Sequence, residues 1–229
     1  MHHFYIDTPI FRDGVTSFEI PKELKHQINN VVRIGINESI VLINNNTKYL
    51  CKIVNNNFEL LEVITNDLTN NFKLTLVQSI PKSSKPEFIV QKATELGADS
   101  IVFYQAKRSI SKIDEKSFIS KQQRYIKIAT EATEQSRRFN VPSISYISNL
   151  GELHSEDTMK LVANENEESL NLSDVVIPNT IKEIQILIGP EGGFDTGEIE
   201  GWTSTSLGKN ILRTETASIA ALAILGIKK

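Results

Sequence analysis

The feature that most constrains this chain is a cluster of glycines directly after a short apolar segment near its C-terminal end. Residues 184–188 (Ile-Gln-Ile-Leu-Ile) are rich in β-branched side chains and predict a buried strand. The sequence Gly189-Pro190-Glu191-Gly192-Gly193 follows at once. Glycine lets a loop adopt positive φ and approach a ligand without a Cβ clash, so valine at Gly192 or Gly193 is expected to be costly. The pattern predicts a binding loop, although an ordinary strand-to-helix turn is an alternative interpretation.

A second glycine-bearing turn comes soon after the first. Asp195 predicts the N-cap of a helix, because Glu198 stands three residues later as in a capping box. The turn Leu207-Gly208-Lys209-Asn210 then precedes a predicted short strand at residues 211–212. Residues 218–225 predict a helix that is apolar on nearly every face and therefore buried. Two such turns at strand ends, so close in the sequence, indicate a single binding site.

These two turns also carry a resemblance to a known family. Neither contains the phosphate-binding pattern G-x-x-x-x-G-K-[ST] or the dinucleotide-binding pattern G-x-G-x-x-G. Together, IGPEGGF (residues 188–194) and LGKNILRTETA (residues 207–217) resemble the C-terminal signature of the SPOUT methyltransferases. In detail they are similar to the subfamily that methylates N3 of a uridine in 16S ribosomal RNA of the small subunit. The resemblance implies a deep trefoil knot that binds S-adenosylmethionine, a connection that periodicity cannot predict.

The N-terminal part reads as closely spaced strands, which predict a small barrel. The strands are expected at residues 16–20, 39–43, 48–54, 58–64 and 72–76, with a helix at 21–30 and asparagine turns at 44–46 and 55–57. His26 and Val31-Val32-Arg33 resemble the H…VLR motif of the family's PUA-like RNA-binding barrel. The chain departs from the family pattern at His3-Phe4-Tyr5, where RFF is usual, and at Asn37-Glu38, where Gly-Asp is usual.

From about residue 71 the pattern changes to alternating strands and helices, which predicts an α/β domain. Helices are expected from residue 86 to Gly97 and over 116–139, and strands at 100–104, 143–147 and 159–163. The predicted domains are therefore residues 1–70, a PUA-like β-barrel, and residues 71–229, a knotted SPOUT methyltransferase domain. The segments QKATELG (91–97) and EATEQSRRFNVP (131–142) match the family closely.

The resemblance assigns roles to individual residues. It implies a donor pocket formed by Leu161, Ala163, Gly189, Pro190, Gly192, Gly193, Leu207, Gly208, Ile211, Leu212, Arg213 and Ala217. Candidates for RNA contacts are Arg33, Lys92, Gln135, Arg137 and Arg138. Lys92 with Glu95 is alternatively an exposed helix pair, and the arginine pair is alternatively a favourable partner for a helix dipole.

The chemistry of N3 methylation suggests three catalytic candidates. The imide proton on N3 must be lost, and Glu191 and Glu215 are the carboxylates near the donor that could accept it. Each has an alternative role of equal weight, hydrogen bonding to backbone N–H groups in its own turn. Arg213 could stabilise negative charge on the uracil or hold a phosphate.

Composition limits the remaining possibilities. The formal net charge of −3 argues against a purely electrostatic nucleic-acid binder, although residues 79–140 carry twelve Lys and Arg against seven Asp and Glu. A single cysteine, Cys51, excludes an internal disulfide framework and suits a reducing cytoplasm. We expect no secretory signal, no membrane span and no metal site.

The predicted function is S-adenosylmethionine-dependent methylation of uridine N3 in 16S ribosomal RNA, by a cytoplasmic homodimer as the family implies. A SPOUT enzyme that methylates a ribose 2′-hydroxyl is the closer alternative. A non-catalytic RNA-binding protein on the same scaffold is the more distant one, and the presence of the glycines and Arg213 argues against it.

Overall fold

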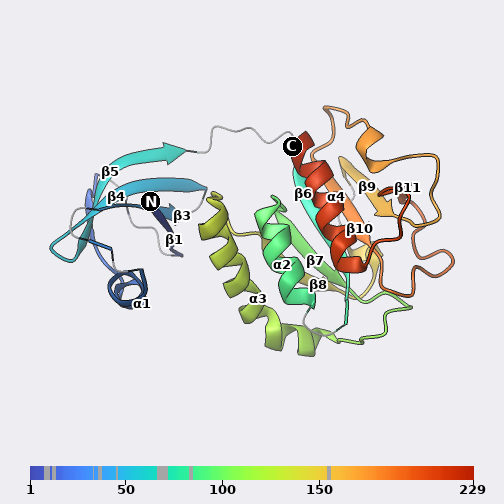
Figure 1. Cartoon of the computed structure of the whole chain (residues 1–229), viewed down its shortest axis with the longest axis horizontal. Coiled ribbons are helices and arrows are strands. Elements are labelled where there is room, and N and C mark those ends of the chain that lie inside the picture. The colour runs from blue at the N-terminus through green and yellow to red at the C-terminus, as the bar shows by residue number, and fades with distance from the viewer. Residues whose placement is uncertain are drawn as a thin grey trace. The chain divides into compact units, whose positions relative to one another are not determined.

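The computed structural model of the chain describes residues 1–7, 11, 14–32, 34–35, 38–44, 46–65, 72–82, 85–153 and 156–229 (Figure 1). Packing divides it into two compact units. The first comprises Met1–Thr69 together with Thr133–Asn140, and the second comprises Asn70–Ala132 together with Val141–Lys229. Each unit has an apolar core of its own.

The first unit is built on a five-stranded sheet in the order β1-β3-β4-β5-β2. Its strands are β1 (His2–Tyr5), β2 (Ser17–Glu19), β3 (Ser39–Asn44), β4 (Thr47–Val54) and β5 (Asn57–Thr65). Strand β1 is parallel to β3, and the other pairs are antiparallel. Asn46, Asn55 and Asn56 adopt φ of 63°, 47° and 66° in the hairpins, which confirms the prediction of asparagine turns there.

Three details of this unit differ from the sequence prediction. Residues 72–76, predicted as a strand of this barrel, belong to the second unit, because residues 73–78 pair in parallel with residues 183–188 of its sheet. Strand β1 was not predicted; it contains the departure His3-Phe4-Tyr5, and Phe4 is buried in the core at 1% exposure. The predicted helix at 21–30 is α1 (Lys22–His26), which continues as a π-helix over Gln27–Val32. The four residues of β1, His-His-Phe-Tyr, are too few to show an alternating apolar pattern. Their place in the sheet comes from parallel pairing with β3.

The second unit is a six-stranded sheet in which every described pairing is parallel, in the order β11-β9-β10-β6-β7-β8. Its strands are β6 (Lys73–Ser79), β7 (Ser100–Tyr104), β8 (Ser143–Ile147), β9 (Thr158–Ala163), β10 (Glu183–Ile188) and β11 (Thr203–Thr205). The register places Ser79 beside Tyr104, and Ile188 beside Ala163. The carboxyl ends of these strands therefore meet at one edge, where open parallel sheets bind ligands.

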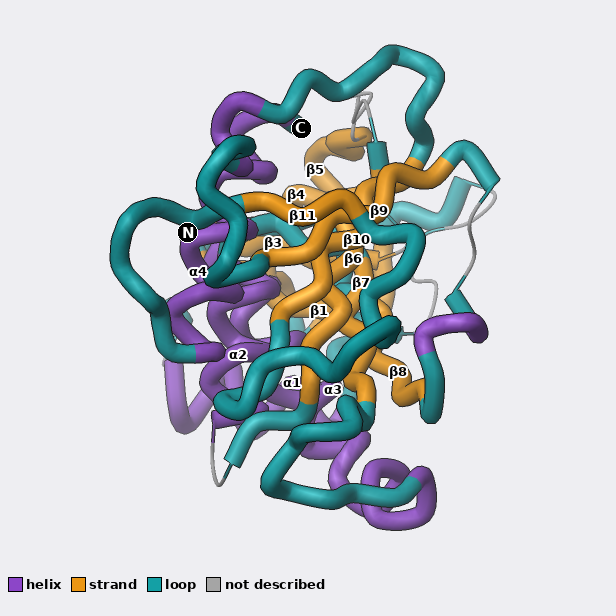
Figure 2. The backbone as a smooth tube through the Cα atoms, turned by 90° about the vertical axis from the view of Figure 1, so that its right-hand side faces the viewer, coloured by secondary structure: helices purple, strands orange, loops and turns teal. Residues whose placement is uncertain are grey.

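One face of this sheet is covered by three helices, α2 (Lys85–Glu95), α3 (Glu115–Ser136) and α4 (Thr214–Lys228) (Figure 1). Figure 2 shows α2 and α4 to one side of the strands. Alternate strand residues face these helices, such as Leu76 and Ile186, and pack with Leu222 of α4. The opposite face includes Val77 and Leu187. Three side chains of the loop after β10 pack against it: Phe194, Ile199 and Trp202. Short 3₁₀ turns lie at Leu150–Glu152 and Leu172–Asp174.

The predicted helix beginning at Asp195 is wrong. Residues 196–201 form successive turns, and Gly197 and Gly201 adopt φ of 77° and 80°, which interrupt a helix. The predicted strand at residues 211–212 is also wrong, because β11 occupies the sheet edge instead and pairs with β9. Helix α4 begins at Thr214, four residues before the predicted start.

Among the described helices, none is both long and apolar enough to cross a membrane.

Candidate functional site

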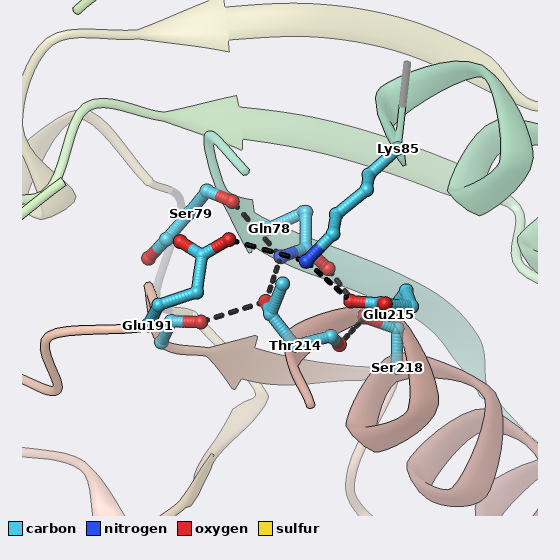
Figure 3. Close-up of polar contacts among 8 residues, drawn as sticks. Gln78, Ser79, Lys85, Glu191, Thr214, Glu215 and Ser218 are labelled. Atoms are coloured by element: carbon cyan, nitrogen blue, oxygen red, sulfur yellow. Dashed lines mark hydrogen bonds and ion pairs between the residues drawn. The ribbon is translucent and has the colours of Figure 1, made fainter. Parts of the chain in front are cut away.

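A buried polar network ties the first turn of α4 to the glycine loop after β10 (Figure 3). Gln78 of β6 is fully buried, and its Nε2 donates to the Ser79 carbonyl and to Thr214 Oγ1, both at 2.9 Å. Thr214 Oγ1 in turn donates to the Gly189 carbonyl at 2.8 Å, and Ser218 Oγ donates to Gln78 Oε1. The start of α4 and the first residue of the Gly189–Gly193 loop are thus held through one strand side chain.

This network predicts a specific loss of stability. Thr214→Val keeps the side-chain volume but removes the acceptor of Gln78 Nε2 and the donor to the Gly189 carbonyl. Because Gln78 is buried and Gly189 is half-buried, we expect the free energy of unfolding to fall by about 1–3 kcal/mol. Urea denaturation measures this, with the exposed Thr216→Val as the control in the same helical turn. Equal midpoints for the two variants would mean that the network does not stabilise the fold.

Lys85, the first residue of α2, bridges a carboxylate of the Gly189–Gly193 loop and a carboxylate of the first turn of α4 (Figure 3). Its Nζ lies 3.3 Å from Glu191 Oε1 and 3.0 Å from Glu215 Oε2. The three side chains are partly exposed, at 28% for Lys85, 26% for Glu191 and 17% for Glu215. The two carboxylates that the sequence analysis singled out therefore share one cation.

The same contacts determine the protonation states of these groups. Burial raises the pKa of the Glu191 and Glu215 carboxyl groups, but backbone hydrogen bonds and Lys85 outweigh it, so the net pKa of each is lowered. The hydrogen bond with Glu215 is the largest influence on Lys85 and raises the pKa of its ammonium group. All three groups are therefore charged at neutral pH, and the carboxylates are weaker bases than an ordinary glutamate.

Gly192 and Gly193 are required for different reasons. A Cβ added to Gly192 would lie 3.0 Å from the Arg108 carbonyl oxygen and 3.3 Å from Arg108 Cβ, so the loop approaches a neighbouring backbone closely. Gly193 instead adopts φ of 66°, in a turn closed by its N–H donating to the Pro190 carbonyl at 3.0 Å. The expectation of positive φ therefore holds for Gly193, whereas at Gly192 the constraint is space.

The loop that follows is fastened to the end of β7. The Glu198 carboxylate accepts hydrogen bonds from the Tyr104 hydroxyl, from the Lys107 N–H at 2.9 Å and from the Asp195 N–H at 2.9 Å. Arg108 Nη2 also lies 3.0 Å from Asp195 Oδ1. One half of the predicted capping box thus forms without a helix, and it anchors the Gly189–Gly193 loop from its far side.

The second turn lies after β11, at the same edge of the sheet. Ala163, the last residue of β9, pairs with both Ile188 and Thr205, so the ends of β10 and β11 flank it. Gly208 adopts φ of 121°, and a Cβ added there would meet no atom of the described residues within 4 Å. A Cβ added at Gly193 would meet, among the described residues, Glu165 Oε1 at 3.9 Å. Both turns therefore border open space, as a ligand-binding cradle requires.

The remaining donor-pocket candidates differ in exposure. Arg213 is exposed and directly precedes α4, where it acts electrostatically on Glu215. Leu161 and Ala217 are buried beneath the edge, and Leu207 and Leu212 pack against the core. Ile211 is 79% exposed. Pro190 is buried. It stands in the sequence between Gly189, whose carbonyl belongs to the polar network, and Glu191.

The RNA-contact candidates are distributed over both units. Arg33, like Asn37 of the departing motif, lies outside the described residues. Lys92 belongs to the second unit and pairs with Glu95 at 2.9 Å. In the first unit, Gln135 and Arg137 are exposed, and Arg138 Nη2 lies 3.5 Å from Asn140 Oδ1. Arg137 directly follows the last residue of α3 and adopts φ of 58°, so its backbone does not continue the helix.

Sequence reasoning missed Gln78, Thr214 and Lys85. A glutamine inside the apolar strand 74–80 was an available signal, because a buried amide requires hydrogen-bond partners. Lys85 gave no signal, since a lysine at a helix start is ordinarily solvated. In the part of the chain that the structure describes, no group of three or more His, Cys, Asp and Glu residues is placed to hold a metal ion.

Comparison with known proteins agrees with this geometry. Residues 68–226 match the RNA methyltransferase domain family. The chain is 32% identical over 228 residues to ribosomal RNA small subunit methyltransferase E of Bacillus subtilis, covering 91% of this chain and 89% of that protein. The crystal structure of the enzyme of that name from Neisseria gonorrhoeae, bound to S-adenosyl methionine, superposes with a TM-score of 0.85 at 27% identity, covering 100% and 98% of the two chains.

A second solved structure is similar over its whole length. It is a methyltransferase from Legionella pneumophila in complex with the cofactor SAM, with a TM-score of 0.81, 26% identity and coverage of 99% and 97%. The fold and the site together define an RNA methyltransferase. This chain belongs to the family whose curated members are named ribosomal RNA small subunit methyltransferase E. The resemblance drawn from IGPEGGF and LGKNILRTETA is thereby confirmed.

Proposed function

We propose that this protein transfers a methyl group from S-adenosylmethionine to N3 of a uridine in 16S ribosomal RNA of the small subunit. The observation that carries the proposal is the meeting of two glycine-bearing turns at one edge of a parallel sheet. The start of α4, which follows the second turn in the chain, is hydrogen-bonded through Thr214 to the Gly189 carbonyl of the first. Similarity to the curated relatives along the whole chain supports the choice of substrate.

The residues at this edge fit the donor. In the part of the chain that the structure describes, no atom other than Glu165 Oε1, at 3.9 Å from the Gly193 position, lies within 4 Å of a Cβ added at Gly193 or Gly208. Backbone N–H and C=O groups of residues 189–193 and 207–213 would bind adenine and ribose, with Ala163 closing the pocket. When bound, S-adenosylmethionine supplies a methyl group on a sulfonium centre, which is a good leaving group.

The protein's contribution is placement and charge. Methyl transfer needs the attacking atom aligned with the methyl carbon, which rigid turns on a sheet provide. Arg213 would stabilise the negative charge that develops on uracil as its N3 proton leaves. Glu191 and Glu215 remain candidates for accepting that proton, but their lowered pKa values make the transfer uphill. We therefore assign the larger role to Arg213.

Recognition of the RNA extends beyond the reacting base. An N3 position is occupied in Watson–Crick pairing, so the target uridine must be unpaired or flipped into the pocket. We propose that the first unit completes a PUA-like barrel that binds RNA, that residues 184–225 form the trefoil knot, and that two subunits act together as a homodimer. Resemblance to the family supports all three points.

Mapping the modification in cells tests the proposed function. Small-subunit RNA from a strain lacking this protein should lack one N3-methyluridine, and complementation with the intact chain should restore it. Mass analysis of RNA fragments locates the nucleotide. An unchanged N3-methyluridine content in the deletion strain would contradict the proposal.

Arg137 and Arg138 provide a separate test of RNA binding. Replacing both by glutamine should weaken binding to small-subunit RNA and reduce the slope of log affinity against log salt by about 1–2, because phosphate contacts release counterions. Binding of S-adenosylmethionine, measured by calorimetry, should stay unchanged. Loss of donor binding as well would reassign the pair to folding or to subunit contact.

A further inference from the structure

The ion-paired trio of Lys85, Glu191 and Glu215 connects three separate segments of the second unit. Lys85 begins α2, Glu191 lies inside the loop after β10, and Glu215 lies in the first turn of α4 (Figure 3). Both carboxylates have an oxygen within 3.3 Å of the same Nζ. Lys85 is thus a direct link between the Gly189–Gly193 loop of the proposed donor pocket and the start of α4.

The charge balance of the trio depends on that one cation. Among the described residues, the charged groups that act on the trio from the elements packed around it are its own members and Arg213, which acts on Glu215. Arg213 is exposed and forms no ion pair with either carboxylate in the described structure. Without Lys85, two partly desolvated carboxylates would face each other with no cation in contact, and like charges at this range repel.

We infer that Lys85 is a positioning residue for the donor pocket: it holds the Gly189–Gly193 loop and the start of α4 together by neutralising the repulsion between Glu191 and Glu215. The inference rests on the proposed function, because it identifies what keeps that pocket assembled. Neither Lys85 nor the pairing of the two carboxylates was predicted from the sequence.

This role gives a pH signature that a merely structural side chain does not give. In the wild type, both carboxylates are ionised and Lys85 is protonated from about pH 5.5 to about pH 8, so the pairing is constant over that range. In Lys85→Met the two carboxylates repel most at the upper end of the range. As the pH falls, one of them takes up a proton, because a like charge raises a carboxyl pKa, and the repulsion is relieved.

The experiment is calorimetry of S-adenosylmethionine binding to the full chain at several pH values. Each variant is compared with the wild type at the same pH, so that titration of the ligand cancels. We expect Lys85→Met to bind about tenfold more weakly near pH 8 and to approach wild-type affinity near pH 5.5. Lys85→Arg keeps the charge and should stay within about threefold of the wild type throughout.

A double variant removes the repulsion in another way. Lys85→Met combined with Glu191→Gln has no facing pair of charges, so it should bind the donor more tightly than Lys85→Met alone at pH 8. Glu191→Gln alone serves as the matched single variant. Recovery in the double variant supports the inference, and it also shows that Lys85→Met had not simply failed to fold.

Two results would overturn it. Donor affinity equal to wild type in Lys85→Met at every pH would mean that the lysine does not position the turns. A deficit that is independent of pH and not relieved by Glu191→Gln would mean that its role is packing alone. Failure of the wild type itself to bind S-adenosylmethionine would instead count against the proposed function, so the two failures are distinguishable.

Discussion

Arg213→Ala is expected to lower kcat for methylation of the small subunit by about 100-fold or more, while donor affinity changes far less. The reason is that a charge-stabilising group acts mainly in the transition state, and removal of one such donor typically costs a factor of this size. Arg213 is exposed, directly precedes α4 and forms no ion pair in the described structure, so it is available to the substrate. Single-turnover rates at saturating donor and RNA give the comparison.

The matched control for Arg213 is an exposed cation away from this edge of the sheet. Lys182 is exposed and directly precedes β10, at the opposite end of that strand from the glycine loop, and Lys182→Ala should leave turnover close to that of the wild type. A loss of rate in Arg213→Ala explained entirely by weaker donor binding would assign the arginine to the donor pocket. Equal effects of the two alanine variants would reduce its role to a general contribution to positive charge.

Gly192→Val is expected to abolish measurable donor binding. A Cβ at this position would lie 3.0 Å from the Arg108 carbonyl oxygen, and backbone cannot move aside as the end of a flexible side chain can. The loop after β7 is itself fixed by the Lys107 N–H and Arg108 contacts with Glu198 and Asp195, so the displacement must fall on the glycine loop. Calorimetry with S-adenosylmethionine measures the affinity.

Thr196→Val is the control for this variant, because Thr196 is exposed in the turn that follows and carries a β-branched side chain already. It should bind the donor within about threefold of the wild type, as expected for surface substitutions away from special contacts. Wild-type affinity in Gly192→Val would show that the loop does not border the donor. Thermal unfolding of both variants separates a local distortion from a general loss of folding.

The elements that the sequence predicted best are those with an apolar period. The strands at 100–104 and 143–147 have the predicted bounds, and the helix predicted over 116–139 is α3, which buries Phe118, Tyr125 and Ala129. Fully buried parallel strands and an amphipathic helix leave a strong pattern of this kind. The α/β class and the edge that carries the glycine loops followed from these elements.

The wrong predictions lie where local signals competed with the rest of the fold. Asp195 and Glu198 have the spacing of a capping box, but the Glu198 carboxylate also accepts from the Tyr104 hydroxyl and the Lys107 N–H, which local sequence cannot show. Strand β11 is Thr-Ser-Thr and has no apolar run, so the apolar pair at residues 211–212 was preferred. The position of β11 at the edge of the sheet comes from its backbone pairing with β9, and not from its apolar content.

The candidate site was predictable only as two loops. The glycines and Arg213 were visible because glycine spacing and the family resemblance marked them. The contacts that hold the loops together, from Gln78 to Thr214 and from Lys85 to Glu191 and Glu215, join residues more than one hundred positions apart. Such pairs depend on the sheet order, which periodicity does not determine.

The most direct test of the central claim is to follow the methyl group itself. The purified protein is incubated with methyl-labelled S-adenosylmethionine and small ribosomal subunits that lack the modification, and the RNA is digested to nucleosides for mass analysis. We predict that the label appears in N3-methyluridine, and that folded subunits are better substrates than short oligonucleotides. Label in a 2′-O-methylated nucleoside, or no transfer to RNA, would contradict the account.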